Sequence, residues 1–345
     1  SEQPENQPPT TDAIAGTTTV AAGPNYQTSR AGRFFFGDLH RQSWVQPVTV
    51  PFLPLDTLFG GLKPVAVGGG RQTTSLKIKA ADGREFVFRS VNKDPVKALD
   101  PRLRETFAAS LIREFTATQH PYGALPVSAL LDRTDILHAR PRLYVLPDHP
   151  ALGSYRQQYA GLFGMLEDRP RKPEKGVPGF AGADDVDRSF TMFRKIYDDN
   201  DYRVDARAFA KARVFDILIG DWGRHEDNWK WALYKNEKGG TFLPVPRDRD
   251  HSFSAWDGLF TSLLDREWAR PNVQHFDYEI RGIRSLTWPA RHLDRLLLTS
   301  LSLDDWQQVT AELQRQITES AIDSAMLAFP EEIRRTSGNK IAAKL

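Results

Sequence analysis

Apolar residues recur at helical spacing in one segment of the second half of the chain, over positions 203–219. Those that share one face are Ala206, Ala210, Val214, Ile217 and Leu218. This spacing predicts an amphipathic helix with Asn200 or Asp201 as its N-cap. The apolar pattern stops at Gly220, and a stretch dense in acidic residues, His and Asn follows over 221–228. The pattern therefore predicts a helix whose C-terminal end leads into a polar loop.

Two short strands are predicted directly after this loop. Positions 230–235 and 241–245 are rich in strand-forming residues, and the segment Asn236–Gly240 between them has the composition of a turn. A second acidic cluster, Pro246–Phe253, follows the second strand. Because a hairpin returns the chain to its starting point, we expect it to bring the two acidic loops together. Oxygen-rich loops held together in this way are typical of a site for a hard divalent metal.

A glycine-rich hairpin is predicted in the first half of the chain. Three glycines at 68–70 and hydroxyl residues at 73–75 lead into strands predicted over 76–79 and 85–91, and Asp82-Gly83 forms the turn between these strands. Backbone amides of a glycine-rich turn can approach an anion closely. The segment therefore indicates either a phosphate-binding hairpin or an ordinary turn.

The remaining pattern predicts further helices, one more strand and one long loop. The helices are expected over 103–119, 124–131 and 154–167, the strand over 142–147 and the loop over 170–187. Near the C-terminal end, Ser302 and Asp305 have the spacing of a capping box, and an apolar helical stripe begins at Trp306.

Composition places the chain among globular proteins and excludes several kinds of site. The 345 residues, 40% hydrophobic and 26% charged, suffice for one large domain or two lobes. A net charge of +2 gives no support to a nucleic-acid partner. No apolar run approaches the roughly 20 residues that cross a bilayer. The absence of cysteine excludes disulfides and thiolate metal sites.

The first 30 residues are rich in Pro, Thr, Gln, Ala and Gly and show no periodicity. This composition predicts a disordered tether over 1–30. Such tethers often follow a cleaved signal or a lipidated cysteine, so the expected location is the cell envelope or periplasm. An ordinary terminus of a cytoplasmic protein is the alternative. The helical pattern over 340–345 lacks a stop signal, so we expect the natural chain to continue beyond Leu345.

The order of these features resembles a two-lobed protein kinase. The loop that ends at Asn228 is similar to the Ile-Gly-x-x-Asp-Arg-x-x-x-Asn loop of atypical kinases, namely the HipA-like proteins, the secreted Golgi casein kinases and the type II phosphatidylinositol 4-kinases. The stretches Gly68–Thr73, Phe88–Asp94 and Arg224–Asp227 resemble still more closely an uncharacterised bacterial envelope-associated kinase-like family. This resemblance covers the chain from about Phe34 to its end.

The resemblance implies an α+β, protein-kinase-like fold with a small β-rich N-lobe over 31–149 and a larger helical C-lobe over 150–345. It also implies that the protein binds ATP with Mg²⁺ or Mn²⁺ and transfers phosphate. The acceptor, a protein, a lipid or another small molecule, cannot be named from the sequence.

Particular residues follow from the same resemblance. Asn228 and Asp248 match metal ligands, and Asp250 is an additional carboxylate. The residues implied to contact the nucleotide are Gly69, Gly70, Arg71, Gln72, Thr73, Arg89 and Lys93, with Glu167 expected near nucleotide or metal. Asp221, Arg224 and Asp227 are the catalytic candidates in the loop. As the helix glutamate of kinases does, Glu114 could pair with Arg89.

One departure from the family pattern concerns the proton acceptor. The base position, five residues before Asn228, holds Gly223, which cannot accept a proton. Asp221 or Asp227 could take that role. General-base catalysis typically contributes about 10²- to 10⁴-fold to the rate, so slow phosphate transfer without a base is physically possible.

Three functions follow as hypotheses. The first is a metal-dependent phosphotransferase, and the second is a pseudokinase that binds nucleotide or a partner without catalysis, which Gly223 favours. The third is a metal-dependent hydrolase built on His225, Asp227, Asp248, Asp250 and His251. It ranks last because no His-x-His or His-Glu-x-x-His spacing is present. Arg224 and His225 have a structural alternative, in which they brace the loop, and Trp222 and Trp229 are expected to pack in the core.

Overall fold

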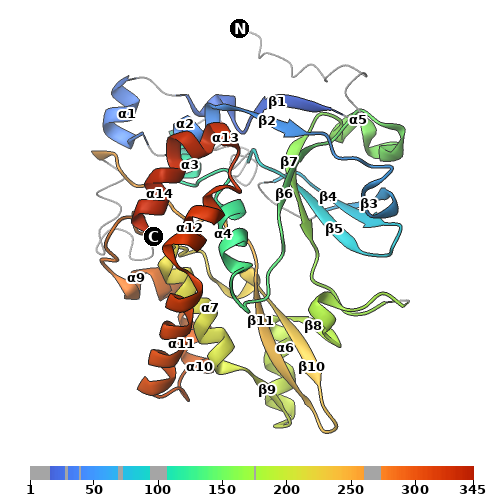
Figure 1. Cartoon of the computed structure of the whole chain (residues 1–345), viewed down its shortest axis with the longest axis vertical. Helices are drawn as coiled ribbons and strands as arrows, with labels where there is room; N and C mark the ends of the chain where they lie inside the picture. Colours follow the sequence, from blue (N-terminus) through green and yellow to red (C-terminus); the bar gives the residue numbers. More distant parts are fainter. Residues whose placement is uncertain are drawn as a thin grey trace. The chain divides into compact units, whose positions relative to one another are not determined.

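The structure, a computed structural model, describes residues 16–27, 30–38, 40–68, 73–93, 107–174, 176–259 and 273–345. The chain divides into two compact units. Figure 1 shows the whole chain, coloured along the sequence. The first comprises Ser1–Asn25, Val45–Arg113 and Pro141–Arg169, and the second comprises Tyr26–Trp44, Glu114–Arg140 and Pro170–Leu345. This division differs from the predicted boundary at 149–150, because residues 150–169 belong to the first unit.

The first unit contains a five-stranded antiparallel sheet. Its strand order is β3-β4-β5-β7-β6, with β3 Leu62–Val67, β4 Ser75–Ala80, β5 Glu85–Ser90, β7 Phe163–Asp168 and β6 Arg142–Val145. Side chains alternate along β4 and β5, so that Leu76, Ile78, Phe86 and Phe88 are buried in one core cluster. The predicted strands over 76–79 and 85–91 and their turn at Asp82-Gly83 are confirmed.

The predicted helix over 154–167 is wrong. A short helix, α5 (Arg156–Tyr159), is followed by Gly161 in a left-handed conformation, with φ 78°, and the chain then enters β7. Four consecutive residues of β7, Phe163 to Leu166, are buried. A continuous apolar run of this length suits a strand covered on both faces, and helical spacing cannot be told from it over so few residues.

The predicted tether over 1–30 does not agree with the structure of its second half. Residues 1–15 lie outside the described part of the chain, but β1 (Thr17–Ala21) pairs antiparallel with β2 (Pro47–Pro51). Backbone pairing therefore orders a segment whose side chains show little hydrophobic pattern.

The second unit contains a four-stranded sheet in the order β8-β10-β11-β9. The strands are β8 Asp185–Arg188, β10 Trp229–Lys235, β11 Gly240–Pro246 and β9 Tyr202–Val204. The hairpin of β10 and β11 confirms the prediction, and its register pairs Trp229 with Pro246. On β10, Trp229 and Trp231 are buried against Phe209, with ring centroids 5.0 and 5.5 Å from the phenyl ring.

Helices are the main secondary structure of the second unit, which confirms the predicted α+β class with a β-rich and a helix-rich part. Helix α7 (Ala206–Leu218) is capped by Asp205, whose side chain accepts from the Ala208 amide at 2.9 Å, so the predicted caps Asn200 and Asp201 are wrong. The capping box of Ser302 and Asp305 is confirmed.

The helices besides α5 and α7 have the following bounds. They are α1 Arg30–Phe36, α2 Arg41–Val45, α3 Phe107–Ala117, α4 Ala124–Leu131, α6 Ser189–Asp198, α9 Ile283–Thr287, α10 Arg291–Leu297, α11 Leu303–Gln316, α12 Glu319–Met326, α13 Glu331–Ile333 and α14 Asn339–Lys344. Among the described residues, none of these helices combines the length and the apolar character that crossing a membrane requires.

Candidate functional site

The two acidic loops of the second unit meet at the base of the β10–β11 hairpin. Gly220, with φ 66°, turns the chain after α7, and the 3-10 turn Glu226–Asn228 leads into β10. At this same base, next to the pair of Trp229 and Pro246, the Arg247 amide donates to the Asn228 carbonyl at 2.9 Å. The Phe253 amide donates to the Ile219 carbonyl at 3.0 Å, which closes the second loop onto the end of α7. The hairpin therefore brings the two loops together, as the sequence predicts.

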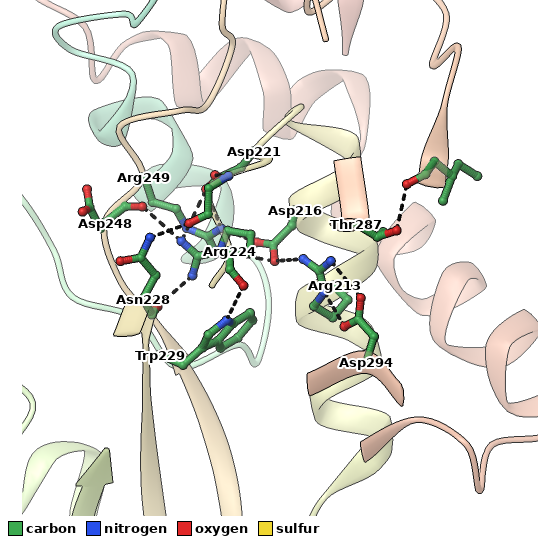
Figure 2. Close-up of polar contacts among 12 residues, drawn as sticks. Arg213, Asp216, Asp221, Arg224, Asn228, Trp229, Asp248, Arg249, Thr287 and Asp294 are labelled. Atoms are coloured by element: carbon green, nitrogen blue, oxygen red, sulfur yellow. Dashed lines mark hydrogen bonds and ion pairs between the residues drawn. The ribbon is translucent and has the colours of Figure 1, made fainter. Parts of the chain in front are cut away.

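A buried cluster of charged side chains lies beneath these loops (Figure 2). We call it the arginine cluster, and its members are Arg213, Asp216, Asp221, Arg224, Arg249 and Asp294. Arg249 donates to Asp216 and, at 3.2 Å, to Asp221. Arg213 donates to Asp216 at 2.7 Å and to Asp294 at 2.8 and 3.1 Å. Three guanidinium groups thus face three carboxylates, so the cluster is balanced in formal charge.

Burial and ion pairing have opposite effects on the pKa values of the carboxyl groups in this cluster. Burial raises the pKa of the Asp216 carboxyl, but Arg249, Arg224 and Arg213 outweigh it and hold that pKa below its usual range. The pKa of Asp294 is raised, because desolvation outweighs the single guanidinium of Arg213. Burial lowers the pKa of Arg224, reinforced by the positive charge of Arg249. Asp216 is therefore the anion around which the three arginines are organised.

Arg224 joins the two loops through their carbonyl groups. Its guanidinium is fully buried and donates to the carbonyls of Arg247 at 2.6 Å, Asp248 at 3.0 Å and Asn228 at 3.0 Å. A planar group with several donors in a fixed fork is suited to this. The geometry favours the bracing role over substrate contact for Arg224.

Asn228 and Asp248 are both held by Arg224, which donates to the main-chain carbonyl of each. The Asn228 carboxamide nitrogen donates to the Gly223 carbonyl, which leaves its Oδ1 oxygen facing away from that bond. Asp248 has φ 57°, a left-handed conformation that costs a non-glycine residue about 1–3 kcal/mol. In Figure 2 the Asn228 oxygen and the Asp248 carboxylate both point away from the arginine cluster, toward the same side. An amide oxygen and a carboxylate are ligands that suit Mg²⁺ or Mn²⁺.

The other loop residues of the prediction differ in exposure. Asp221 is buried, accepts from the Gly223 amide at 3.1 Å and pairs with arginines, so the geometry does not favour it as a proton acceptor. Asp227 is exposed, and Asp250 is half-buried. Within the described ranges, no three His, Asp or Glu side chains lie together as a metal site.

Gly223 is closely packed against a histidine. A Cβ built on Gly223 would lie 2.1 Å from Cδ2 and 3.1 Å from Nε2 of His251. The His251 ring packs on Trp222, with centroids 4.0 Å apart, and its Nδ1 is 3.3 Å from the Gln119 carboxamide nitrogen. The His251 imidazole therefore fills the space that a side chain at position 223, the predicted base position, would occupy.

The first unit carries the predicted nucleotide-binding residues of the N-terminal half. Arg89 on β5 pairs with Glu167 on β7 at 3.2 Å, and both side chains are about one-fifth exposed, 19% and 22%. Thr73 and Lys93 are half-buried, whereas Gly69, Gly70, Arg71 and Gln72 lie outside the described residues. On either side of that gap, the Gly68 amide donates to the Ser75 carbonyl at 2.8 Å, as a hairpin requires.

Glu114 does not have the partner that the kinase resemblance suggests. It forms an ion pair with Arg41, and Arg41 also donates to the Tyr26 carbonyl at 3.2 Å. All three residues belong to the second unit. Arg89 instead takes its acidic partner, Glu167, from the neighbouring strand.

Five residues of the site were not predicted from the sequence. They are Arg213, Asp216, Arg249, Asp294 and His251, the last considered only as a metal ligand. The spacing of three between Arg213 and Asp216, and again between Asp221 and Arg224, was a usable signal, because such pairs lie side by side on a helix or tight turn. Nothing in the sequence indicated that His251 would pack on Gly223.

Comparison with solved structures finds similarity to kinases. The proinflammatory kinase CtkA of Helicobacter pylori is 10% identical with a TM-score of 0.42, and the match covers 82% of this chain and 91% of that one. Rio2 kinase of Chaetomium thermophilum, solved as an ADP/Mg²⁺-phosphoaspartate complex, is 11% identical with a TM-score of 0.37, over 81% and 68% of the chains. No family model matches the sequence, and no curated protein matches it. At these values the similarity says nothing about activity, which depends on the residues of the site.

Proposed function

We propose that the protein is an ATP-dependent phosphotransferase that requires Mg²⁺ or Mn²⁺. The observation that carries the proposal is the pair Asn228 and Asp248, whose oxygen atoms are held on one side of the arginine cluster. The Asn228 side chain is tied through its nitrogen, so the oxygen keeps one orientation. The Asp248 backbone is held by Arg224 in a conformation that it would not adopt freely. Such preorganisation lowers the cost of binding a cation.

Asn228 and Asp248 would hold the metal, with Asp250 as a further carboxylate from the same loop. When bound, the metal supplies positive charge that neutralises the phosphate oxygens. The buried arginine cluster keeps both loops in place without offering its own charge to the nucleotide, because its three guanidinium groups are paired with Asp216, Asp221 and Asp294.

Arg89 is the phosphate-contacting cation in this proposal. Its ion pair with Glu167 fixes the guanidinium on the surface of the first unit's sheet. In the kinases that the sequence resembles, a lysine usually occupies this strand position. Arginine presents a bidentate fork that suits phosphate oxygens, so arginine at this position is compatible with nucleotide binding.

A second candidate function is nucleotide binding without transfer. The close packing of His251 on Gly223 favours it, because no carboxylate can enter the base position while the ring is there. The two candidates share the same metal-binding residues and differ in turnover.

Titration calorimetry with ATP and Mn²⁺ tests the proposal. We expect saturable binding that needs the metal, and at least a tenfold weaker affinity in Asp248→Asn, equivalent to about 1.4 kcal/mol. Asp323→Asn is the matched control, because it removes an exposed carboxylate on α12 in the same unit. Binding that is equal in the two variants, or no binding in the unaltered protein, would contradict the proposal. Release of ADP with a labelled acceptor then separates transfer from binding alone.

A further inference from the structure

A cavity of about 200 Å³ lies within the second unit. Its lining comes from four segments that are distant in the sequence, which begin at Asp38, Phe253, His275 and Thr336. None of the described residues proposed to bind metal or nucleotide lines it, and no member of the arginine cluster does. Pockets for drug-sized ligands typically enclose about 300–1,000 Å³, so this cavity suits a smaller molecule.

The backbone has rare conformations at two places in the wall of this cavity. Phe253 has φ 59°, a left-handed conformation that a non-glycine residue keeps only where its surroundings enforce it. The turn Arg334–Gly338, between α13 and α14, is a π-helix, a rare form that is found frequently at functional sites. Contacts hold both places, since His40 Nε2 donates to the Phe253 carbonyl at 2.6 Å and the Ser337 hydroxyl lies 3.1 Å from His120 Nε2. The wall is therefore a fixed structure with features that are typical of a ligand site.

The positive charges of the cavity come from α14 (Asn339–Lys344). Lys340 and Lys344 both line the cavity and are four positions apart, so they lie on one face of this helix. Lys344 Nζ donates to the Phe276 carbonyl at 2.8 Å and pairs with Asp277 at 3.4 Å, which fixes it at the wall. Lys340 is exposed and forms no hydrogen bond or ion pair with any described residue. The cavity thus has one fixed and one available ammonium group on the same helix face.

The negative charges of the cavity come from other segments. Asp38 and Asp257 both line it. A Cβ built on Gly37 would overlap the Asp257 carboxylate, so this carboxylate lies beside the backbone that directly precedes Asp38. The ion pair of Asp38 with Arg33 is weak, because it spans 4.0 Å between exposed side chains. The two carboxylates therefore form a second, negative end of the cavity.

The two histidines of the wall add no charge. Burial is the main cause of the low pKa of His40, about 4, and the charges of Asp257 and Lys344 act on that pKa in opposite directions. His40 is therefore neutral and lies near both charged ends. His275 accepts from the Trp256 amide through Nδ1 at 2.8 Å, as a neutral ring does. The lysines and the aspartates consequently determine the electrostatics of the cavity.

Part of the wall is apolar. Phe253, Phe276 and Ile341 line the cavity, and each is at most 8% exposed. The rings of Phe253 and Phe276 are in edge contact, with centroids 5.0 Å apart. Aromatic and aliphatic surface of this kind suits a ligand with a hydrocarbon part.

We propose that the cavity binds a small zwitterion, an α-amino acid with an apolar side chain. Its carboxylate pairs with Lys340 beside Lys344, and its ammonium group pairs with Asp38 and Asp257. A ligand with a single charge is less complementary, because an anion would face two aspartates and a cation would face two lysines. The inference does not depend on phosphate transfer, since the cavity shares no described residue with the proposed metal and nucleotide sites.

Saturation-transfer NMR on the purified chain, without ATP or metal, is the first test. Each proteinogenic L-amino acid is added alone, and transfer of saturation to its side-chain protons reports binding. We expect transfer to one or more of the apolar amino acids. Transfer to none of them would overturn the inference.

The need for both charges is the second test. For an amino acid that binds, the matching amine lacks the carboxylate and the matching carboxylic acid lacks the ammonium group. Each should bind about tenfold more weakly in competition, because a charge-assisted hydrogen bond is lost. Equal affinity of the carboxylic acid would indicate an anion site, and equal affinity of the amine would indicate a cation site. Either result would overturn the inference.

Variants of the charged ends complete the test. Lys340→Met removes the available ammonium group and should weaken binding of the same amino acid by about tenfold. The fold should tolerate this change, because Lys340 is exposed and has no partner among the described residues. Lys238→Met, in the exposed hairpin turn of the same unit, is the matched control, and Asp38→Asn tests the negative end in the same way. Equal affinity for the amino acid in Lys340→Met and Lys238→Met would overturn the inference. Binding of Mn²⁺ with ATP should be the same in both variants, which separates this cavity from the proposed phosphotransfer site.

Discussion

The imidazole of His251 fills the space that any side chain at Gly223 would need, with ring carbon Cδ2 2.1 Å from the position of a Cβ. The ring cannot move aside freely, because it packs on Trp222 and contacts Gln119. The loop departs from the pattern that it resembles at Gly223, and the His251 ring fills the space beside this glycine.

Gly223→Ala is expected to destabilise the protein. Overpacking of a closed site typically costs about 1–3 kcal/mol of unfolding free energy, and a Cβ here would overlap an aromatic ring. Combining it with His251→Ala should cost less than the sum of the two single variants, because the second change makes room for the first. Urea denaturation of the three variants measures this coupling, and strictly additive effects would contradict the packing.

The contact between His251 and Gly223 also predicts which variants can accommodate a carboxylate at position 223. Gly223→Asp alone should lose stability and gain no transfer to hydroxyl acceptors, whereas Gly223→Asp with His251→Ala offers the carboxylate space. Labelled transfer to a seryl peptide is the measurement. Gain of hydroxyl transfer in the single variant would show that the imidazole does not block the position.

Arg249→Met should unfold the site more than most single changes. It removes the guanidinium that donates hydrogen bonds to the buried carboxylates of both Asp216 and Asp221, and breaking a buried ion pair typically costs about 3–5 kcal/mol. Arg335→Met is the matched control, because its ion pair with Glu331 is exposed, with 74% and 59% of the side chains accessible. Loss of this pair should lower the free energy of unfolding by less than about 1 kcal/mol. Similar denaturation midpoints for the two variants would refute the structural importance of the cluster.

Stability should fall as the pH drops from 7 to 5. Burial lowers the pKa of His40 to about 4 and that of His120 well below 6.5, and the two rings pack at 4.7 Å between centroids. Both histidines are neutral when folded, so below pH 6.5 the unfolded chain binds more protons and is favoured. Each should contribute a loss of about 1.4 kcal/mol per pH unit, down to its folded pKa.

The His120→Gln variant tests this pH dependence. It should lower the slope of unfolding free energy against pH between 5 and 6 by about 1.4 kcal/mol per pH unit, measured by urea denaturation. His225→Gln is the control, since His225 is exposed. An unchanged slope in His120→Gln would contradict the assignment of the pH dependence to the buried pair.

Local patterns allowed much of this fold to be predicted, and contacts between distant segments explain the rest. The helix before the loop and the hairpin after it follow from spacing within one segment, and the observed α7, β10 and β11 confirm them. Strand β7 could not be distinguished from a helix, because its apolar run is buried on both faces. The partner of Glu114 is Arg41, 73 positions away, and no local pattern indicates such a pairing.

The residues of the candidate site could likewise be predicted only where the signal lies within one segment. Asn228, Asp248 and Gly223 were identified by a motif, because a motif records positions in one loop. The role of Arg224 as a brace depends on carbonyls at 228, 247 and 248, which become neighbours only when the hairpin forms. The contact between His251 and Gly223 likewise requires the folded second loop.

Paramagnetic broadening by Mn²⁺ with ATP tests the central claim most directly. The side-chain amide signal of Asn228, assigned with Asn228→Leu, reports a cation bound to its oxygen. Asn236, at the opposite end of β10, is the internal control, because a strand rises by about 3.3 Å per residue and β10 spans Trp229–Lys235. We predict that the Asn228 signal broadens beyond detection while the Asn236 signal persists. A sharp Asn228 signal at saturating Mn²⁺ and ATP would contradict the account.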